Sequence, residues 1–256
     1  MAGDVLLDRG AGLIFPASYA LIASAHMKRY GTTLDDLALV SLKNHQNANL
    51  NPLAHFYHKR ATLDDIRNSP PICSPLRLFD CSPVSDGAAA AVVSAERRSH
   101  EDVEVVASGM ATDTLALAER ADFTYFTASR IAAAQAYEQA GMEPSDIDLA
   151  EVHDCFTIAE LVALEDLGFC QPGDGKHLIR EGCTARTGSI PTNVDGGLKA
   201  DGHPIGASGL AQVFEVVTQL RGKAGERQLA KASTGLTHSV GGIGGTSVVH
   251  IFRKGD

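Results

Sequence analysis

Residues 193–209 read NVDGGLKADGHPIGASG, a glycine-rich stretch that carries one histidine, His203. Glycine adopts backbone conformations that other residues resist, and it lets other groups approach closely. Pro204 stiffens the chain directly after the histidine. Small residues then lead into the amphipathic run 210–220, which predicts a helix. A loop of this kind beside a helix start is suited to aiming a base at an anionic or carbonyl substrate.

The function of His203 has two interpretations at this point. Near a helix N-terminus the local positive potential disfavours the imidazolium form, so we expect a neutral ring that can accept a proton. A loop histidine bonded to backbone explains the residue equally well when it is considered alone. The surrounding glycines favour a functional role.

Outward from this stretch, the chain alternates predicted helices with short apolar strands. Helices are expected over 17–30, from Thr33 towards Asn47, over 127–140, and from Thr157 to Gly168, where Thr157 and Glu160 form a capping-box pattern. Strands are expected at 76–79, 103–107, 147–152, 230–236 and 246–252. The alternation predicts an α/β fold with a mixed or parallel sheet that helices cover on both faces.

Composition limits the classes of function. The 256 residues carry a formal net charge of −9 without a basic run, so we expect no nucleic-acid binding. No apolar run approaches the length of a membrane span and no leader is apparent, so we expect neither membrane insertion nor secretion. Five cysteines without a CxxC pair indicate reduced thiols, and we predict a cytoplasmic protein.

Two further residues follow the predicted strand 147–152. His153 lies in a strand–loop–helix unit, where open α/β sheets bind ligands, and it could donate a hydrogen bond to a carbonyl oxygen. Cys155 lies two residues before the expected N-cap, Thr157, a position that can lower a thiol pKa. A buried, inert cysteine is the alternative.

The stretch 237–245 offers glycine amides together with His238 and Ser239. Such amides can form an oxyanion hole, and a plain glycine-rich hairpin is the alternative. His153, Cys155 and His203 have ligand types that zinc accepts, but no fourth ligand is spaced to complete a site, so we expect no metal. A basic group is expected to be a solvated face that could also meet phosphates; it comprises His55, His58, Lys59 and Arg60.

Four stretches together resemble the thiolase superfamily, in the form of the sterol-carrier-protein-type (SCP2) thiolases. They are HDCF at 153–156, GHP at 202–204 with Gly206-Ala207, HSVGGIGG at 238–245, and CSPVSDGAA at 81–89. The resemblance implies a thiolase-like fold. Residues 127–256 would be a complete C-terminal domain. Residues 1–126 would be an incomplete N-terminal domain with a helical loop insertion at about 31–78.

The resemblance also implies roles for individual residues. The histidine matching His203 activates a nucleophilic cysteine and helps to hold the thioester oxygen, and the one matching His153 contributes to that oxyanion hole. The cysteine matching Cys155 moves the proton on the α-carbon of the second acyl-CoA. Gly241 matches the glycine whose amide serves the second oxyanion hole, and Ser108 matches a serine that meets the pantetheine of coenzyme A.

In other thiolases the acid/base cysteine lies in the last loop, where this chain has Ser239, and the shift to Cys155 is consistent with the SCP2 type. In the family the acyl-accepting cysteine precedes the region resembling residues 10–80. We therefore expect it to be missing here, since Cys73 and Cys81 are in the wrong place to replace it. We expect a homodimer or a partner chain that supplies the missing half.

The resemblance implies an acyltransferase that uses acyl-CoA and coenzyme A as substrates and needs no cofactor. The reaction is thiolysis of a 3-oxoacyl-CoA or the reverse Claisen condensation. One alternative is a thiolase-like subunit that binds acyl-CoA and needs a partner, for instance in a retro-aldol complex that cleaves steroid side-chain CoA esters. Another is a truncated product of a normal gene.

Overall fold

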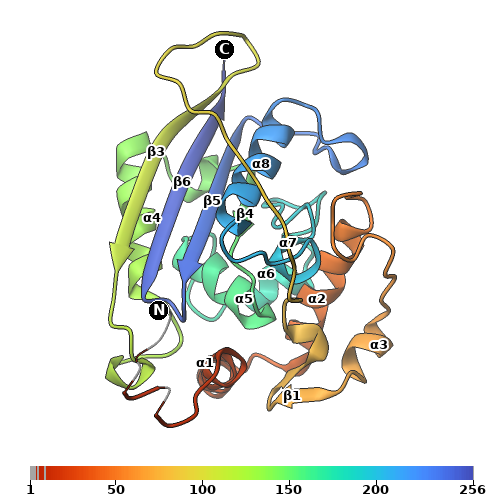
Figure 1. Cartoon of the computed structure of the whole chain (residues 1–256), viewed down its shortest axis with the longest axis vertical. Helices are drawn as coiled ribbons and strands as arrows, with labels where there is room; N and C mark the ends of the chain where they lie inside the picture. The colour runs from red at the N-terminus through yellow and green to blue at the C-terminus, as the bar shows by residue number, and fades with distance from the viewer. Residues whose placement is uncertain (1–3, 5, 9, 256) are drawn as a thin grey trace.

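The computed structural model describes residues 4, 6–8 and 10–255, and its centre is one mixed sheet (Figure 1). The strand order is β3-β6-β5-β4. The strands span Val103–Thr112 (β3), Thr246–Lys254 (β6), Thr234–Gly241 (β5) and Leu149–Val152 (β4). β4 runs parallel to β5, and the other pairs are antiparallel.

Helices cover both faces of this sheet. Alternate strand residues point to opposite faces, so on β4 Ala150 packs with the alanines of α4 (Thr127–Ala140), whereas Leu149 packs with α8 (Ser208–Leu220). The α/β fold with a mixed, helix-covered sheet is therefore confirmed.

The remaining elements surround the sheet. The helices are α1 (Phe15–Tyr30), α2 (Leu34–Ala48), α3 (Leu63–Arg67), α5 (Thr157–Asp166), α6 (Gly175–Arg180) and α7 (Gly197–Ala200). A small hairpin joins β1 (Pro71–Cys73) to β2 (Leu76–Arg77). Single 3₁₀ turns lie at Leu78–Asp80, Leu117–Glu119, Pro144–Asp146 and Gly225–Arg227.

Local signals determine the ends of the N-terminal helices as predicted. α1 ends at Gly31, whose φ of +72° is left-handed and therefore favours glycine. Thr33 caps α2 by accepting a hydrogen bond from the Asp36 amide, and the Asp36 carboxylate accepts one from the Thr33 amide in return. Both helices pack against α5.

Predictions at β5 and at α5 were wrong. β5 continues through Gly241, because its pairing with β6 extends to the Gly241–Thr246 pair, so His238 and Ser239 lie in a strand rather than in a loop. The capping box at α5 does not form. Thr157 is instead the first helical residue, and its hydroxyl donates to the Asp80 carboxylate at 2.7 Å.

The outer edge of the sheet, β3, is closed by side chains. Gln139 and Gln135 of α4 accept hydrogen bonds from the backbone amides of Ser108 and Met110. These bonds occupy donors that an exposed edge would offer to another strand. β3 also lies on the N-terminal side of the expected boundary at residue 126, so the sheet crosses that boundary.

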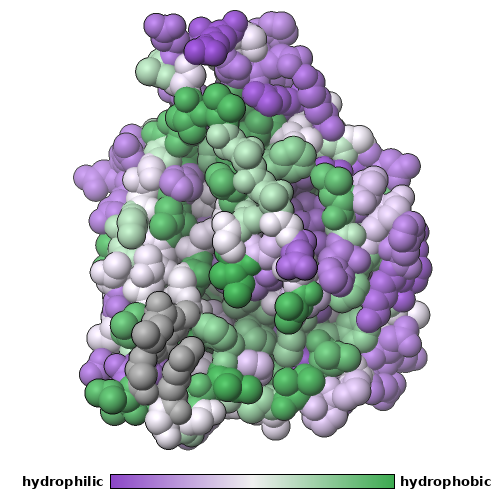
Figure 2. All heavy atoms as spheres, in the orientation of Figure 1, coloured by the Kyte–Doolittle hydropathy of each residue, from purple (hydrophilic) through white to green (hydrophobic). Residues whose placement is uncertain are grey.

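Residues 84–94 are extended and, except for a single bridge between Val84 and His203, unpaired (Figure 1). Val84 and Val92 are 98% and 95% exposed. Figure 2 shows hydrophobic residues on the face of the molecule that segment 84–94 crosses in Figure 1. Ile205 and Phe214 are 83% and 48% exposed.

None of the helices in the described part of the chain is both long enough and apolar enough to cross a membrane.

Candidate active site

His153 and His203 lie side by side, as two separate loops bring them together. His153 directly follows β4, and His203 lies between α7 and α8. Their ring centroids are 5.2 Å apart, and the rings meet edge to face at 86°. Burial lowers the pKa of both imidazoles. The positive charge of a protonated His203 lowers the pKa of His153 further by like-charge repulsion. Two neutral imidazoles are thus held together at neutral pH.

The hydrogen bonds of Ser208 determine which nitrogen of His203 carries the proton. The Ser208 hydroxyl donates its only proton to the Pro204 carbonyl oxygen at 3.1 Å and lies 2.7 Å from Nδ1 of His203. With that proton on the Pro204 carbonyl, Nδ1 is the donor to the hydroxyl oxygen and Nε2 keeps its lone pair. The prediction of a neutral, proton-accepting His203 agrees with this geometry. Its cause is burial rather than the helix N-terminus.

Cys155 departs from the expected chemistry. Phe156, not Thr157, is the N-cap residue of α5, so Cys155 directly precedes the cap. The predicted lowering of the thiol pKa is wrong: burial raises the pKa of Cys155 to about 12. The thiol is 6% exposed, and desolvation outweighs any effect of the helix terminus. Cys155 is thus a protonated thiol at neutral pH.

β5 contributes His238 and Ser239, which point to opposite faces of the sheet. His238 Nε2 lies 2.9 Å from the Ser129 hydroxyl of α4, whereas the Ser239 hydroxyl donates to Gln212 of α8 at 2.7 Å. Burial lowers the pKa of His238 to about 4 and it lies close enough to His153 to affect its pKa. His238 therefore lies near His153, and Ser239 lies on the opposite face of the sheet.

Gly241 and Ser108, the two other residues that the resemblance singled out, lie on different strands of the sheet. Gly241 is the last residue of β5, and the Gly244 and Gly245 amides donate to its carbonyl. Ser108 lies on β3, paired with His250 on β6. β4 and β3 are three strand spacings apart, which is about 14 Å. The structure therefore does not bring Ser108 to the histidines.

Asp154, which sequence reasoning missed, ties the two histidine loops together. Its carboxyl group accepts hydrogen bonds from the Leu198 amide at 2.7 Å, the Lys199 amide at 3.3 Å and the Asn44 side chain at 2.7 Å. A Cβ placed on Gly197 would lie 2.4 Å from this carboxyl group, so glycine is required for the close approach. Burial raises the pKa of Asp154 to about 8.

A second buried carboxylate extends the same network. Glu160 of α5 accepts hydrogen bonds from the side chains of Asn44 at 2.8 Å and Asn193 at 2.9 Å, and it forms an ion pair with Lys43 at 3.0 Å. Asn193 also accepts from the Val152 amide, at the end of β4. α2 therefore helps to position both site loops, and its polar residues are buried for that reason.

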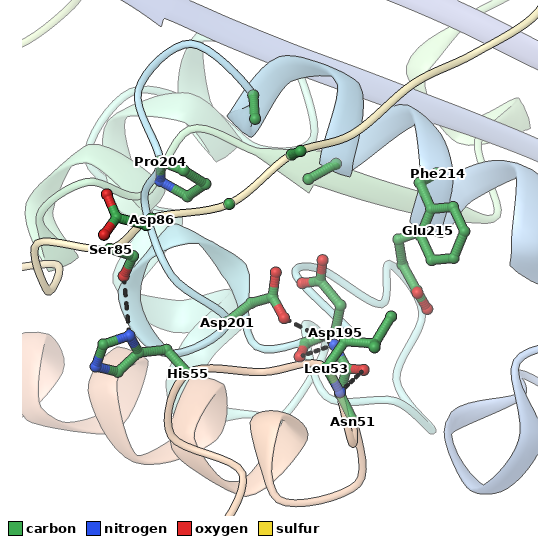
Figure 3. A pocket seen from close by; sticks show the side chains of 14 residues that line it. Asn51, Leu53, His55, Ser85, Asp86, Asp195, Asp201, Pro204, Phe214 and Glu215 are labelled. Atoms are coloured by element: carbon green, nitrogen blue, oxygen red, sulfur yellow. Dashed lines mark hydrogen bonds between the residues drawn. The ribbon is translucent and has the colours of Figure 1, made fainter.

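A pocket of about 270 Å³ lies beside the His203 loop, between residues 85–88 and α8 (Figure 3). Four acidic side chains line it: Asp86, Asp195, Asp201 and Glu215. Burial raises the pKa of Asp195 to about 6 and that of Asp201 to about 8. None of the described lining residues is a lysine or an arginine that could meet the phosphates of coenzyme A.

The basic group at 55–60 is partly occupied by local contacts. His55 Nδ1 lies 3.0 Å from the Ser85 hydroxyl, as Figure 3 shows. The Lys59 ammonium lies 4.9 Å from the ring centroid of Phe56 and 4.8 Å from that of Phe79. These contacts favour the solvated-face interpretation for His55 and Lys59.

The zinc alternative gains no support from the geometry. Among residues 4, 6–8 and 10–255, no group of three or more His, Cys, Asp or Glu side chains could hold a metal ion.

Comparison with known proteins agrees with the resemblance seen in the sequence. Residues 109–254 match the family model described as thiolase C-terminal domain-like. An acetyl-CoA acetyltransferase of Methanothermobacter thermautotrophicus is 48% identical over 99% of this chain and 67% of its own length. Sterol carrier protein 2 of Oryctolagus cuniculus is 38% identical over 98% of this chain and 48% of its own length.

A solved structure described as "Ltp2-ChsH2(DUF35) aldolase" has the same arrangement of elements. It matches 96% of this chain and 65% of its own, with a TM-score of 0.83 and 26% sequence identity. The chain thus spans between about half and two thirds of the length of these relatives.

Proposed function

This chain belongs to the thiolase family, and on that premise we propose that it carries out acyl transfer at coenzyme A thioesters by SCP2-type thiolase chemistry. The reaction is thiolysis of a 3-oxoacyl-CoA or the reverse Claisen condensation. The observation that carries this proposal is the pairing of His153 with a His203 whose Nδ1 is anchored by Ser208, which leaves Nε2 free to accept a proton.

Each group has a task in this reaction. His203 Nε2 takes the proton from an attacking thiol, so that the thiolate can add to the thioester carbon. His153 donates a hydrogen bond to the developing oxyanion. Cys155 exchanges a proton with the α-carbon of the second acyl-CoA. The proposed chemistry needs thiols, imidazoles and the thioester, and we propose no cofactor and a cytoplasmic site of action.

We further propose that the acyl-accepting thiol lies outside residues 1–256. Burial raises the pKa of Cys81 to about 11 and the pKa values of Cys155 and Cys170 to about 12. An attacking cysteine needs the opposite shift. The exposed segment 84–94 beside His203 offers a place where the part that carries this thiol could bind.

Proton exchange tests the proposal without the acyl-accepting thiol. The purified chain should speed deuterium incorporation at the α-carbon of acetyl-CoA in D₂O, followed by NMR, whereas its thiolysis of acetoacetyl-CoA should be negligible. Cys155→Ser should abolish the exchange, and Cys183→Ser should leave it unchanged. Exchange at the buffer rate, or exchange that survives Cys155→Ser, would refute the role of this site. Thiolysis by residues 1–256 alone at a rate typical of intact thiolases would refute the need for a further thiol.

One observation favours a second candidate, a subunit of an aldol-cleaving complex. The Ltp2-ChsH2(DUF35) aldolase structure matches nearly the whole chain with a TM-score of 0.83. Under this candidate, the chain combined with a DUF35-type protein should release an aldehyde or ketone from a 3-hydroxyacyl-CoA in the absence of free coenzyme A. Thiolysis needs free coenzyme A, so the dependence on that reactant separates the two candidates.

A further inference from the structure

Arg120 belongs to none of the thiolase-like motifs, yet its guanidinium group contacts the glycine-rich turn between β5 and β6, residues 242–245. Its Nη1 donates a hydrogen bond to the carbonyl oxygen of Ile243 at 2.5 Å, and its Nη2 donates to that of Thr114 at 3.1 Å. The guanidinium also lies 5.8 Å from the ring centroid of the buried Phe126. A cation from another part of the chain therefore holds this turn.

A chain of hydrogen bonds leads from Arg120 through the turn. Ile243 shares a peptide group with Gly244, whose amide donates to the carbonyl oxygen of Gly241 at 3.3 Å. Gly241 shares the next peptide group of the chain with Gly242. The carbonyl and the amide of a trans peptide point in opposite directions, so each peptide group passes its polarisation on to the next. The chain of hydrogen bonds ends at the Gly242 amide.

The Gly242 amide is the free end of this chain. Among residues 4, 6–8 and 10–255, no acceptor lies within hydrogen-bond distance of it. Gly242 is half-buried, and its φ of +66° is left-handed, a conformation that favours glycine. Backbone amides that lose part of their contact with water need an acceptor. This donor is therefore available to an oxygen atom of a ligand.

The turn packs against the loop that carries the HDCF motif. β4 and β5 run parallel, so the loop after β4 and the turn after β5 leave the same edge of the sheet. Ile243 belongs to one buried cluster with Tyr19 and Cys155. The Tyr19 hydroxyl also donates to the carbonyl oxygen of Gly242 at 3.1 Å. The turn is thus held beside groups that the proposed reaction uses.

We propose that Arg120 is a positioning residue, which orients and polarises the Gly242 amide as a hydrogen-bond donor to the carbonyl oxygen of an acyl thioester. A donor polarised by a cation binds more strongly to an oxygen that gains negative charge. This donor is additional to the Gly241 amide that the family resemblance indicates. The role in turnover rests on the proposed function, whereas the effect on the amide can be measured without substrate.

Solvent exchange of amide protons, measured by NMR on the full chain, tests the effect on Gly242. In the unmodified chain Gly242 should exchange faster than Gly244 and Gly245, whose amides donate to the Gly241 carbonyl. Arg120→Gln removes the charge, so the Gly242 amide should become less acidic and exchange about threefold more slowly, the effect of half a pKa unit. A merely structural loss would loosen the turn and speed the exchange.

Two results would overturn the proposal. One is a Gly242 amide that exchanges as slowly as Gly244 and Gly245 in the unmodified chain, a comparison that holds even if Arg120→Gln fails to fold. The other is an unchanged or faster exchange of Gly242 in Arg120→Gln.

Arg29→Gln and Arg120→Lys are the matched controls. Arg29 forms an ion pair with Asp122 and donates to Thr124 at 3.4 Å, so its replacement removes the same charge without touching the turn. Gly242 should exchange at the unmodified rate in Arg29→Gln and close to that rate in Arg120→Lys, which keeps the charge. Slowing in either control as large as in Arg120→Gln would overturn the proposal.

Deuterium incorporation into acetyl-CoA tests the role in turnover. Arg120→Gln should lower the rate at saturating acetyl-CoA about tenfold, less than the loss of a whole oxyanion donor costs, and leave the dissociation constant of acetyl-CoA unchanged. Arg120→Lys should restore most of the rate. An unchanged rate in Arg120→Gln would overturn this role. A lack of incorporation by the unmodified chain would instead refute the proposed function, while amide exchange would still decide the effect of Arg120 on Gly242.

Discussion

The two loops that carry His153 and His203 differ sharply from the segment 84–94 in how many contacts with the rest of the chain fix them. Asp154 and Glu160 are fully buried, and each accepts hydrogen bonds from groups on other segments of the chain. In the segment 84–94, Val84 and Val92 meet solvent over nearly their whole surface. The chain therefore fixes the geometry of its histidines by itself, while the surface beside them is uncovered. Variants of both regions can test this difference.

Removing the Asp154 carboxyl group should have the largest effect. Asp154→Ala leaves the Leu198 and Lys199 amides and the Asn44 side chain without their acceptor, at a cost of about 3 kcal/mol or more in the free energy of unfolding. Urea denaturation measures this cost. Asp35→Ala, which removes an exposed ion pair with Arg67, is the control and should cost under about 1 kcal/mol. Equal losses would mean that Asp154 does not hold the loops.

Stability should fall as pH rises from 6.5 to 8. Burial raises the pKa values of Asp154 and Asp201 to about 8, so in this range the folded chain keeps protons that the unfolded chain has released. The expected loss is about 1 kcal/mol per pH unit for each group. The lowered histidine pKa values oppose this loss up to about pH 7.5, because unfolded histidine, with a pKa of about 6.5, still binds protons there.

Urea denaturation at several pH values checks this slope. Asp154→Asn cannot titrate and should reduce the slope by about half. A stability that rises with pH over this range would contradict the assignment of these two carboxyl groups as protonated and buried.

The smallest effect is expected in the uncovered segment. Val93→Ala should change the free energy of unfolding by less than about 0.5 kcal/mol, because Val93 is 84% exposed. The same change at Val216, a fully buried residue of α8 that packs with Leu149 and Phe252, should cost about 2 kcal/mol. A comparable loss at both positions would show that the segment packs tightly in solution.

Local signals in the sequence were sufficient for several elements. α4 spans the predicted 127–140 and ends at Gly141 in the left-handed conformation, and the Thr33 cap forms as expected. Those predictions succeeded because each depends on residues within one helical turn. The capping box at Thr157 and Glu160 failed because both side chains bond to distant partners instead.

The candidate site was also predictable only in part, because motifs identify residues but do not reveal contacts between distant parts of the chain. The motifs identified His153 and His203, and the structure places their rings together. The sequence could not reveal Asp154 as a tie between loops, because its partner Asn44 lies 110 positions away. The sequence also predicted the wrong direction for the pKa shift of Cys155, because the desolvation that raises this pKa comes from tertiary packing.

The central claim is that His203 is held as a neutral base with Nε2 unprotonated. Nitrogen-15 NMR of the imidazoles at pH 7, assigned with a His203→Gln variant, tests it most directly. We expect the signals of a neutral ring with the proton on Nδ1, as the Ser208 contact requires. A protonated imidazolium, or a neutral ring with the proton on Nε2, would contradict the account.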